Sequence, residues 1–242
     1  MEDSKSRISP GEYSKLRSAF FKHEQRRSFG YKIELTDREK KANEILMAAK
    51  NEELAIGFKT PYKFNPSRHF FEAFDNITTS NLFKIIEMMP KGGVLHAHDT
   101  ALCSTDFLIS LTYWDNLWMC HDEKMDQVVL MFSKKQPTIK PDFPPNMLCK
   151  WKKVSDERKL KGAKVFDEEF RKRMSLYPVQ QFRDINHVWE VFSGIFATIN
   201  GLLMYAPAWE AYYYNALKEF RADNVNYLEF RTTLPVILST YD

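Results

Sequence analysis

The chain has 242 residues, of which 44% are hydrophobic and 14% aromatic, and its formal net charge at pH 7 is +3. A chain of this length and apolar content can bury a substantial core, which excludes a disordered chain and predicts one large domain or a domain with an appendage. The small net charge gives no reason to expect nucleic acid as a partner, and no apolar run approaches the roughly 18 residues that a membrane span needs.

The first predicted helix follows a capping box at Thr36 and Glu39, where each residue can satisfy a backbone N–H near the other. Apolar side chains recur behind this cap at helical spacing, at Ala42, Ile45, Leu46 and Ala49. The pattern predicts an amphipathic helix over residues 36 to about 54, which ends near Gly57.

Two short elements and a strand follow this helix. A polar, proline-bearing stretch at 59–68 leads to a short helix or turn at 69–74. Ser80 is placed to cap the next helix, whose apolar side chains share one face and which Pro90 stops. Two glycines then free the chain to reverse direction, and residues 93–98 predict a buried strand.

The segment from Thr112 to Lys164 has a different character, with four prolines, paired lysines and no long helical period. This composition predicts an insertion of short strands and loops. Between residues 134 and 164, ten Lys or Arg residues stand against three acids, which favours either a cationic surface or an ordinary solvated loop.

Two helices and a second strand complete the pattern. Asn186 can cap a helix over 187 to about 199, with Gly201 just past its end. The segment 207–222 opens with a proline, which suits the first turn of a helix, and residues 225–231 predict a second buried strand. The order strand, helices, strand is typical of an α/β barrel or a doubly wound sheet and not of a helical bundle.

Two histidines end the first predicted strand. Side chains alternate across a strand, so His96 and His98 point the same way with their Cα atoms about 6.5–7 Å apart, and two neutral imidazoles at that distance can bind one zinc ion. The alternative is a pair of histidines satisfied by water and backbone. Asp99 follows directly, and active sites of parallel α/β folds lie at the carboxyl ends of strands, which favours the metal site.

The cysteines and the one sequon bear on the cellular compartment. Cys103, Cys120 and Cys149 lack the paired spacing of a structural zinc site, so one bridge with a free thiol and three cytosolic thiols both stay open. Asn76 begins a glycosylation sequon that matters only in the secretory pathway. Residues 1–13 lack the apolar core of a signal peptide, so the sequence by itself favours a leaderless chain.

The segment MPKGGVLHAHD at 89–99 resembles the first-strand motif of the adenosine deaminase-related growth factors, the secreted branch of the adenosine deaminase family. Segments on both sides are similar to the same family in order and spacing, at 69–93, 149–159 and 187–236. The resemblance covers almost the whole chain from about residue 12.

The resemblance implies an α/β fold, the beginning of a zinc-dependent (β/α)8 metal-hydrolase barrel. Residues 1–87 would form the amino-terminal helical dimerisation region, and 88–111 the first barrel strand with the start of the following helix. Residues 112–165 would form a receptor-binding insertion, and 166–242 the barrel helices and the second strand. In the family a disulfide closes the insertion, which here implies a bridge from Cys120 to Cys149.

The resemblance also implies hydrolytic deamination of adenosine to inosine and ammonia, in which zinc lowers the pKa of a bound water and a carboxylic acid protonates the purine ring. His96 and His98 would be two zinc ligands, and Asp99 would contact the substrate. The substrate-pocket helix would contribute Trp189, Glu190, Phe192, Ser193 and Phe196. Ser193 and Gly194 depart from the polar pattern of the family, and the Ser193 departure leaves that part of substrate recognition open.

The implied partners follow from the same resemblance. They are adenosine or 2'-deoxyadenosine as substrate, a second copy of the chain in a homodimer, and a receptor or glycosaminoglycan on the basic insertion. The implied location is extracellular, with a growth-factor-like role, where Asn76 would be glycosylated and Cys103 would stay a free thiol. No membrane span and no nucleic acid are implied.

Members of the family need a third zinc histidine, a catalytic glutamate, a further histidine and an aspartate pair on later strands, and this sequence ends after the second strand. None of its other histidines sits at the end of a predicted barrel strand. We therefore expect an incomplete active site, a chain that is inactive or very weak by itself, and exposed apolar faces on the 187–199 and 207–222 helices. Two alternatives are a non-catalytic binding form that keeps the dimerisation region and the insertion, and an unrelated amidohydrolase acting on another amine.

Overall fold

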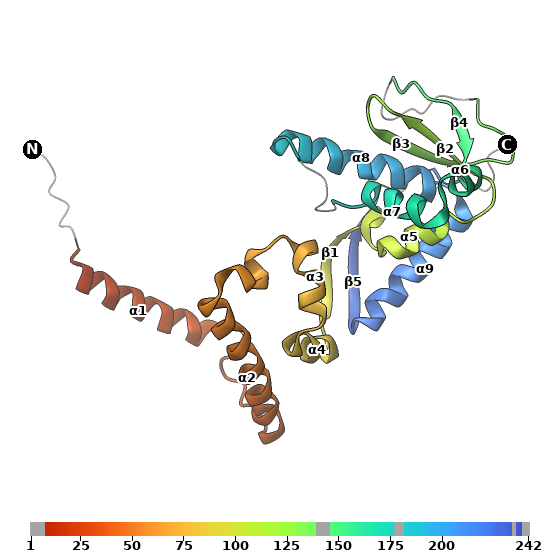
Figure 1. Cartoon of the computed structure of the whole chain (residues 1–242). Coiled ribbons are helices and arrows are strands. Elements are labelled where there is room, and N and C mark those ends of the chain that lie inside the picture. The colour runs from red at the N-terminus through yellow and green to blue at the C-terminus, as the bar shows by residue number, and fades with distance from the viewer. Residues whose placement is uncertain (1–7, 139–145, 177–181, 234–235, 239–242) are drawn as a thin grey trace, which may run out of the picture. The chain divides into compact units, whose positions relative to one another are not determined.

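The computed structural model of the chain describes residues 8–138, 146–176, 182–233 and 236–238 (Figure 1). The chain divides into two compact units, Met1–Glu52 and Glu53–Asp242. No helix among the described residues is both long enough and apolar enough to cross a membrane.

The first helix, α1 (Pro10–Arg27), has no counterpart among the predicted elements. It begins with a capping box in which Ser9 accepts a hydrogen bond from the Glu12 N–H at 3.3 Å and Glu12 accepts one from the Ser9 N–H at 2.9 Å. The helix buries none of its residues within the chain, although Tyr13, Leu16 and Phe20 recur at helical spacing on one side.

The helix predicted from residue 36 is α2 (Asp37–Lys59), and its capping box is confirmed. Thr36 donates its backbone N–H to the Glu39 carboxylate at 2.7 Å, and the Glu39 N–H donates to the Thr36 hydroxyl at 3.3 Å. The helix ends at Lys59, close to Gly57, near which the sequence predicted its end. A Cβ at Gly57 would stand 2.5 Å from Cδ2 of Phe64. The glycine therefore allows the Phe64 ring to pack against the helix backbone and does not end the helix.

Four short helical segments lead to the first strand. They are η1 (Pro61–Lys63), η2 (Asn65–Ser67), α3 (Phe70–Thr78) and α4 (Asn81–Met88). Ser80 caps α4 as predicted, because its hydroxyl accepts from the Phe83 N–H at 2.9 Å. The sequon residue Asn76 lies exposed on α3.

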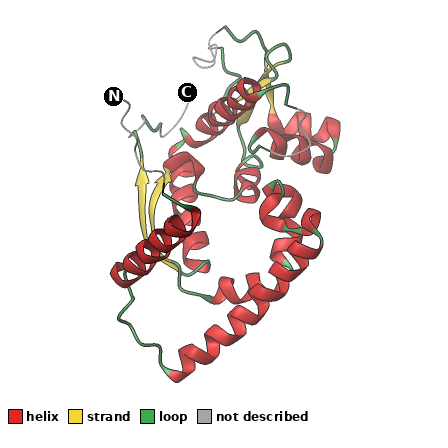
Figure 2. Cartoon of the chain, turned by 90° about the vertical axis from the view of Figure 1, so that its left-hand side faces the viewer, coloured by secondary structure: helices red, strands yellow, loops and turns green. Residues whose placement is uncertain are grey.

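The two predicted strands form a parallel pair. β1 (Gly92–His98) pairs with β5 (Val225–Arg231), and the register joins Gly92 to Val225 at one end and His98 to Arg231 at the other. Figure 2 shows the pair side by side, apart from the other strands. Parallel strands need a crossover connection, and here the crossover contains all the remaining elements.

The expectation that these strands are buried is wrong. Neither strand contains a buried residue, and Leu95 and Tyr227 leave 63% and 54% of their surface exposed. A parallel sheet is normally covered on both faces, and the described chain supplies only two strands and partial helix cover.

The crossover begins at the end of β1 with η3 (Asp99–Ala101). Its remaining elements are α5 (Thr105–Leu111), β2 (Leu117–Asp122), β3 (Gln127–Phe132), β4 (Trp151–Lys153), α6 (Val154–Lys161), α7 (Ala163–Arg173), α8 (Ile185–Leu203) and α9 (Ala206–Ala222). The second sheet is antiparallel in the order β3-β2-β4, which confirms short strands in the insertion. The prediction of loops around 154–161 is wrong, because this segment forms the helix α6. The helix was missed because its only buried residues are Val154 and Arg158. An arginine at a buried position hides the helical period.

One hydrophobic core joins the insertion to the helices of the crossover. It includes Leu117, Leu130, Phe166, Leu202 and Tyr212, which come from two strands and three helices. The segment predicted as an insertion is therefore not a separate lobe, because its sheet shares a core with α8 and α9.

The expected exposure of the two long helices is partly wrong. The second half of α8 packs against β3, and α9 buries Ala208, Tyr212 and Ala216. Exposure is confined to the first half of α8, where Ile185 and Trp189 protrude, and to the outer face of α9.

Both ends of α8 differ from the prediction. The cap is Asp184 and not Asn186, because the Asp184 carboxylate accepts from the His187 N–H at 2.9 Å. Gly201 lies inside the helix and not beyond its end. A Cβ at Gly201 would stand 2.0 Å from the carbonyl oxygen of Leu130, so the glycine is required for β3 to approach α8.

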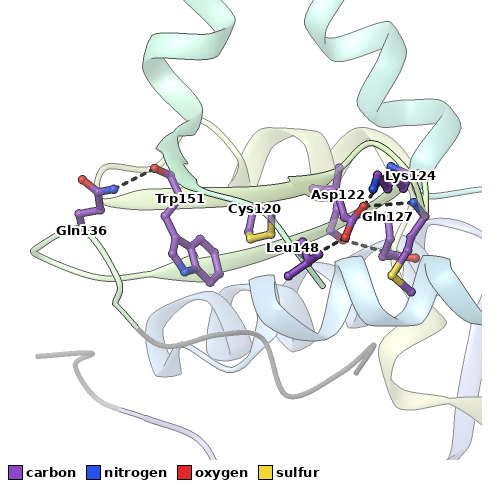
Figure 3. Close-up of a disulfide and its surroundings, with 10 residues drawn as sticks. Cys120, Asp122, Lys124, Gln127, Gln136, Leu148 and Trp151 are labelled. Atoms are coloured by element: carbon purple, nitrogen blue, oxygen red, sulfur yellow. Dashed lines mark hydrogen bonds between the residues drawn. A yellow bond between two sulfur atoms is a disulfide. The ribbon is translucent and has the colours of Figure 1, made fainter. Parts of the chain in front are cut away.

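The disulfide between Cys120 and Cys149 is confirmed, with a Cα–Cα distance of 5.5 Å (Figure 3). Beside it the Asp122 carboxylate accepts backbone N–H bonds from Leu148 at 2.7 Å, Met125 at 3.2 Å and Lys124 at 3.0 Å. These bonds hold the pKa of Asp122 below its usual value. Two neighbouring contacts therefore fix the segment at 146–153 against β2.

Removing this disulfide should lower the free energy of unfolding by about 3 kcal/mol, because the bridge closes a loop with a sequence separation of 29 residues. We expect a Cys120→Ser, Cys149→Ser double variant to unfold at a lower urea concentration than the oxidised chain. The reduced wild-type chain is the matched control and should unfold at the same urea concentration as the double variant. Equal midpoints for the oxidised chain and the double variant would contradict the prediction.

The third cysteine, Cys103, is a free and half-buried thiol, as expected. Burial raises its pKa to about 12. It is therefore a protonated packing residue at neutral pH and not a reactive thiolate.

Candidate functional site

The two histidines lie at the carboxyl end of β1 with their rings close together. The ring centroids of His96 and His98 are 5.3 Å apart and both side chains are exposed. A zinc ion bound tetrahedrally by two imidazole nitrogens at roughly 2.0–2.1 Å places the ring centroids about 5 Å apart. The pair therefore fits two ligands of one zinc ion.

A local irregularity in the strand pairing lies at the first of these histidines. β1 advances from Val94 to Ala97 while β5 advances only from Leu228 to Phe230, so β1 carries an extra residue in the interval that contains His96. Bulges of this kind re-aim side chains and are frequent beside active sites. The strand alternation alone predicts two histidines on one face but does not predict this bulge.

The described residues offer no third protein ligand beside the pair. Among the residues that the structure describes, no group of three His, Cys, Asp or Glu side chains could hold a metal ion. If the pair bound zinc, His96 and His98 would supply two of the three protein ligands that catalytic zinc sites normally have.

Asp99 opens the η3 turn directly after the histidines. Its carboxylate accepts the Thr100 N–H at 2.8 Å. Burial and the Asp99 charge raise the pKa of Tyr213, whose ring contacts Phe230 of β5 with centroids 5.4 Å apart. The sequence gives no signal for Tyr213, which lies on α9 more than a hundred residues away in the chain.

The five residues predicted on the substrate helix lie on two faces of α8. Trp189, Phe192 and Phe196 form an edge-to-face aromatic row, with centroid separations of 5.5 and 5.0 Å. The tryptophan is 60% exposed, so this row can stack on an added ring. α8 also packs against η3, which makes the helix a neighbour of the Asp99 turn.

Glu190 and Ser193 face a different space. Both line a cleft of about 770 Å³ between α8, the end of α7 and the turn that joins β2 to β3. Glu190 forms an ion pair with Arg183 at 3.5 Å. The structure therefore does not bring all five predicted residues together, and their contacts with a substrate stay a prediction.

The departure from the family pattern at Gly194 has a packing explanation. A Cβ at Gly194 would stand 2.4 Å from Oε1 of Gln127. The Gln127 amide donates to the Gly194 carbonyl and to the Thr198 hydroxyl, each at 3.0 Å. This glycine therefore serves the contact between β3 and α8.

Comparison with known proteins shows which family the sequence resembles. The family model described as adenosine/AMP deaminase N-terminal matches residues 1–86. An adenosine deaminase of Lutzomyia longipalpis is 46% identical over 226 residues, which cover 92% of this chain and 43% of that protein. An adenosine deaminase 2 of Homo sapiens is 34% identical over 210 residues, which cover 85% of this chain and 40% of that protein.

An adenosine deaminase of Aedes albopictus is 36% identical over 230 residues, or 93% of this chain and 41% of that protein. The chain thus spans less than half the length of the curated relatives it matches. Over the part that it spans, the chain belongs to the adenosine deaminase family that includes the adenosine deaminase 2 proteins.

Proposed function

We propose that this chain is part of a zinc-dependent adenosine deaminase, which converts adenosine or 2'-deoxyadenosine and water to inosine or 2'-deoxyinosine and ammonia. The observation that carries the proposal is the His96–His98 pair, with ring centroids 5.3 Å apart at the carboxyl end of β1. The parallel pairing of β1 with β5 through a helical crossover supports the start of a (β/α)8 barrel, in which sites lie at this end of the strands.

The described residues suggest a division of tasks. His96 and His98 would hold the metal through ring nitrogens, and the aromatic row that starts at Trp189 offers a face on which a purine can stack. Asp99, at the start of the turn after β1, would accept a hydrogen bond from the substrate. When bound, zinc lowers the pKa of a water so that it can attack the purine carbon that carries the amine.

A two-histidine site does not complete a catalytic zinc centre, so the 242-residue chain alone should be inactive or very weak. The purified chain is expected to release no ammonia from adenosine above the level of a His96→Ala, His98→Ala double variant. Turnover by the wild-type chain that a chelator abolishes would contradict this incompleteness.

Zinc binding tests the proposed site directly. We expect calorimetry to show zinc binding by the wild-type chain, and at least a tenfold weaker affinity in His96→Ala or His98→Ala, because each change removes half of the protein ligands. His23→Ala removes an exposed histidine of α1 and is the control, with unchanged affinity. Equal zinc affinity in the double variant and the wild-type chain would refute the site.

We further propose an extracellular location. The Cys120–Cys149 disulfide suits an oxidising compartment, and the exposed Asn76 sequon is accessible for glycosylation. A secreted chain with a growth-factor-like role would carry a glycan at Asn76 that a glycosidase removes.

A second candidate function is binding without catalysis. One observation favours it: α1 exposes Tyr13, Leu16 and Phe20 on one side and buries none of its residues, as a dimerisation helix would in a separated protomer. A receptor or glycosaminoglycan contact through the insertion has weaker support. Arg158 is buried there, and Lys152 and Lys161 form ion pairs. Sedimentation of the purified chain distinguishes a dimer from a monomer.

A further inference from the structure

The turn that follows the histidine strand is bound by one face of α9. Residues 99–104 connect β1 to α5, and they begin with Asp99. Three side chains of α9, at Tyr212, Asn215 and Glu219, recur at the spacing of one helix face and direct their polar atoms to this turn.

The phenol of Tyr212 binds two consecutive backbone N–H groups. Its oxygen accepts from Leu102 at 2.7 Å and from Cys103 at 3.3 Å. Tyr212 is fully buried, and burial raises the pKa of its hydroxyl group although the two N–H bonds favour the phenolate. In return the Cys103 thiol donates to the Tyr212 carbonyl at 3.1 Å.

The carboxylate of Glu219 binds the next residue of the turn. It accepts the Ser104 N–H at 2.8 Å and the Ser104 hydroxyl at 2.6 Å. The Asn215 amide donates to the same carboxylate at 2.7 Å and fixes its orientation. Each of the three backbone N–H groups from 102 to 104 therefore has its acceptor on α9.

The same helix also reaches the site. Tyr213 lies beside Asp99 and against Phe230 of β5, so adjacent residues of α9 contact the turn and the carboxyl end of the sheet. A mobile turn would leave His98 at a fraying strand end, and a site with only two ligands depends strongly on their preorganisation.

From this geometry we propose that Tyr212 and Glu219 are positioning residues, which hold the 99–104 turn so that His98 and Asp99 keep their places at the metal site. The inference rests on the proposed zinc site. The roles are distinct from catalysis, because both side chains act through their bonds to the backbone of the turn.

Tyr212→Phe is the sharpest test, because it keeps the buried ring and removes only the acceptor of two N–H groups. In the 242-residue chain we expect faster amide hydrogen exchange across 99–104 and a five- to tenfold weaker zinc affinity. Glu219→Gln is a second variant, which keeps one acceptor and should show a smaller change in the same two measurements.

Two controls separate positioning from loss of stability. Tyr214→Phe changes an exposed tyrosine of the same helix and should leave both measurements unchanged. Val154→Ala destabilises the core at α6 and should lower the unfolding midpoint without selective exchange at 99–104 or weaker zinc binding.

The outcomes are distinguishable. Unchanged exchange at 99–104 in Tyr212→Phe, or faster exchange with wild-type zinc affinity, overturns the positioning role. If Val154→Ala lowers the zinc affinity as much as Tyr212→Phe does at equal stability, the positioning role is also overturned. Failure of the wild-type chain to bind zinc would refute the proposed function, and the exchange comparison would then decide whether α9 holds the turn.

Discussion

Replacing Gly201 by alanine is expected to lower the free energy of unfolding of the Glu53–Asp242 unit by about 3 kcal/mol. The added Cβ would stand 2.0 Å from the Leu130 carbonyl oxygen and 2.9 Å from the carbonyl carbon. These are backbone atoms of β3 inside a hydrogen-bonded sheet, so they cannot yield as a side chain can. We expect β3 to move away from α8. Tryptophan fluorescence should then show unfolding at a lower urea concentration than in the wild-type chain.

Gly194 provides a graded comparison on the same helix face. Alanine there would meet the Gln127 side chain and not backbone, so the side chain can rotate away at the cost of its bonds to Gly194 and Thr198. We expect a loss of about 1 kcal/mol for Gly194→Ala. Gly11→Ala in α1, where nothing lies within 4 Å of the new Cβ, should not destabilise the chain.

Equal unfolding midpoints for Gly201→Ala and the wild-type chain would show that β3 does not contact α8 as described. The contact matters for function because α8 carries the aromatic row at Trp189 and also packs against the Asp99 turn. A shift of the insertion sheet would therefore be transmitted to the helix on which the proposed purine would stack.

The elements that sequence predicts well here are those specified by neighbouring residues. β5 is found at the predicted bounds, and α9 begins with the predicted proline at 207 in its first turn. α1 carries the same capping signal as α2, and Tyr13, Leu16 and Phe20 follow it at helical spacing, so this helix could have been recognised from the sequence. α6 is different, because one of its two buried residues is Arg158, and no hydrophobic pattern reveals a buried guanidinium.

The candidate site divides in the same way. His96 and His98 lie two residues apart in one strand, so strand alternation predicts them on one face, and Asp99 follows directly in the chain. Tyr213 and the side chains that hold the 99–104 turn are brought there by tertiary packing over more than a hundred residues. Gly194 shows the converse, since it departs from the family pattern on the predicted substrate helix and the structure places the Gln127 side chain against it.

Replacing Arg158 by methionine is expected to cost about 3 kcal/mol of unfolding free energy, although methionine preserves most of the side-chain volume. Arg158 is 7% exposed, and its guanidinium donates to the Asp167 carboxylate at 3.0 Å, the Thr112 carbonyl at 3.0 Å and the Thr112 hydroxyl at 2.6 Å. It also lies over the rings of Tyr113 and Phe166, 3.7 and 4.7 Å from their centroids.

Methionine would leave the Thr112 carbonyl without its donor and Asp167 without its cation, and the loss of both explains the size of the effect. Arg158→Lys should recover less than half of the stability, because one ammonium cannot reproduce the fork that joins α5 to α7. Lys159→Met, an exposed neighbour on α6, is the matched control and should change the midpoint by no more than about 0.5 kcal/mol. Similar midpoints for Arg158→Met and Lys159→Met would mean that α6 is held by Val154 alone, and the charged contacts would then be incidental to the insertion.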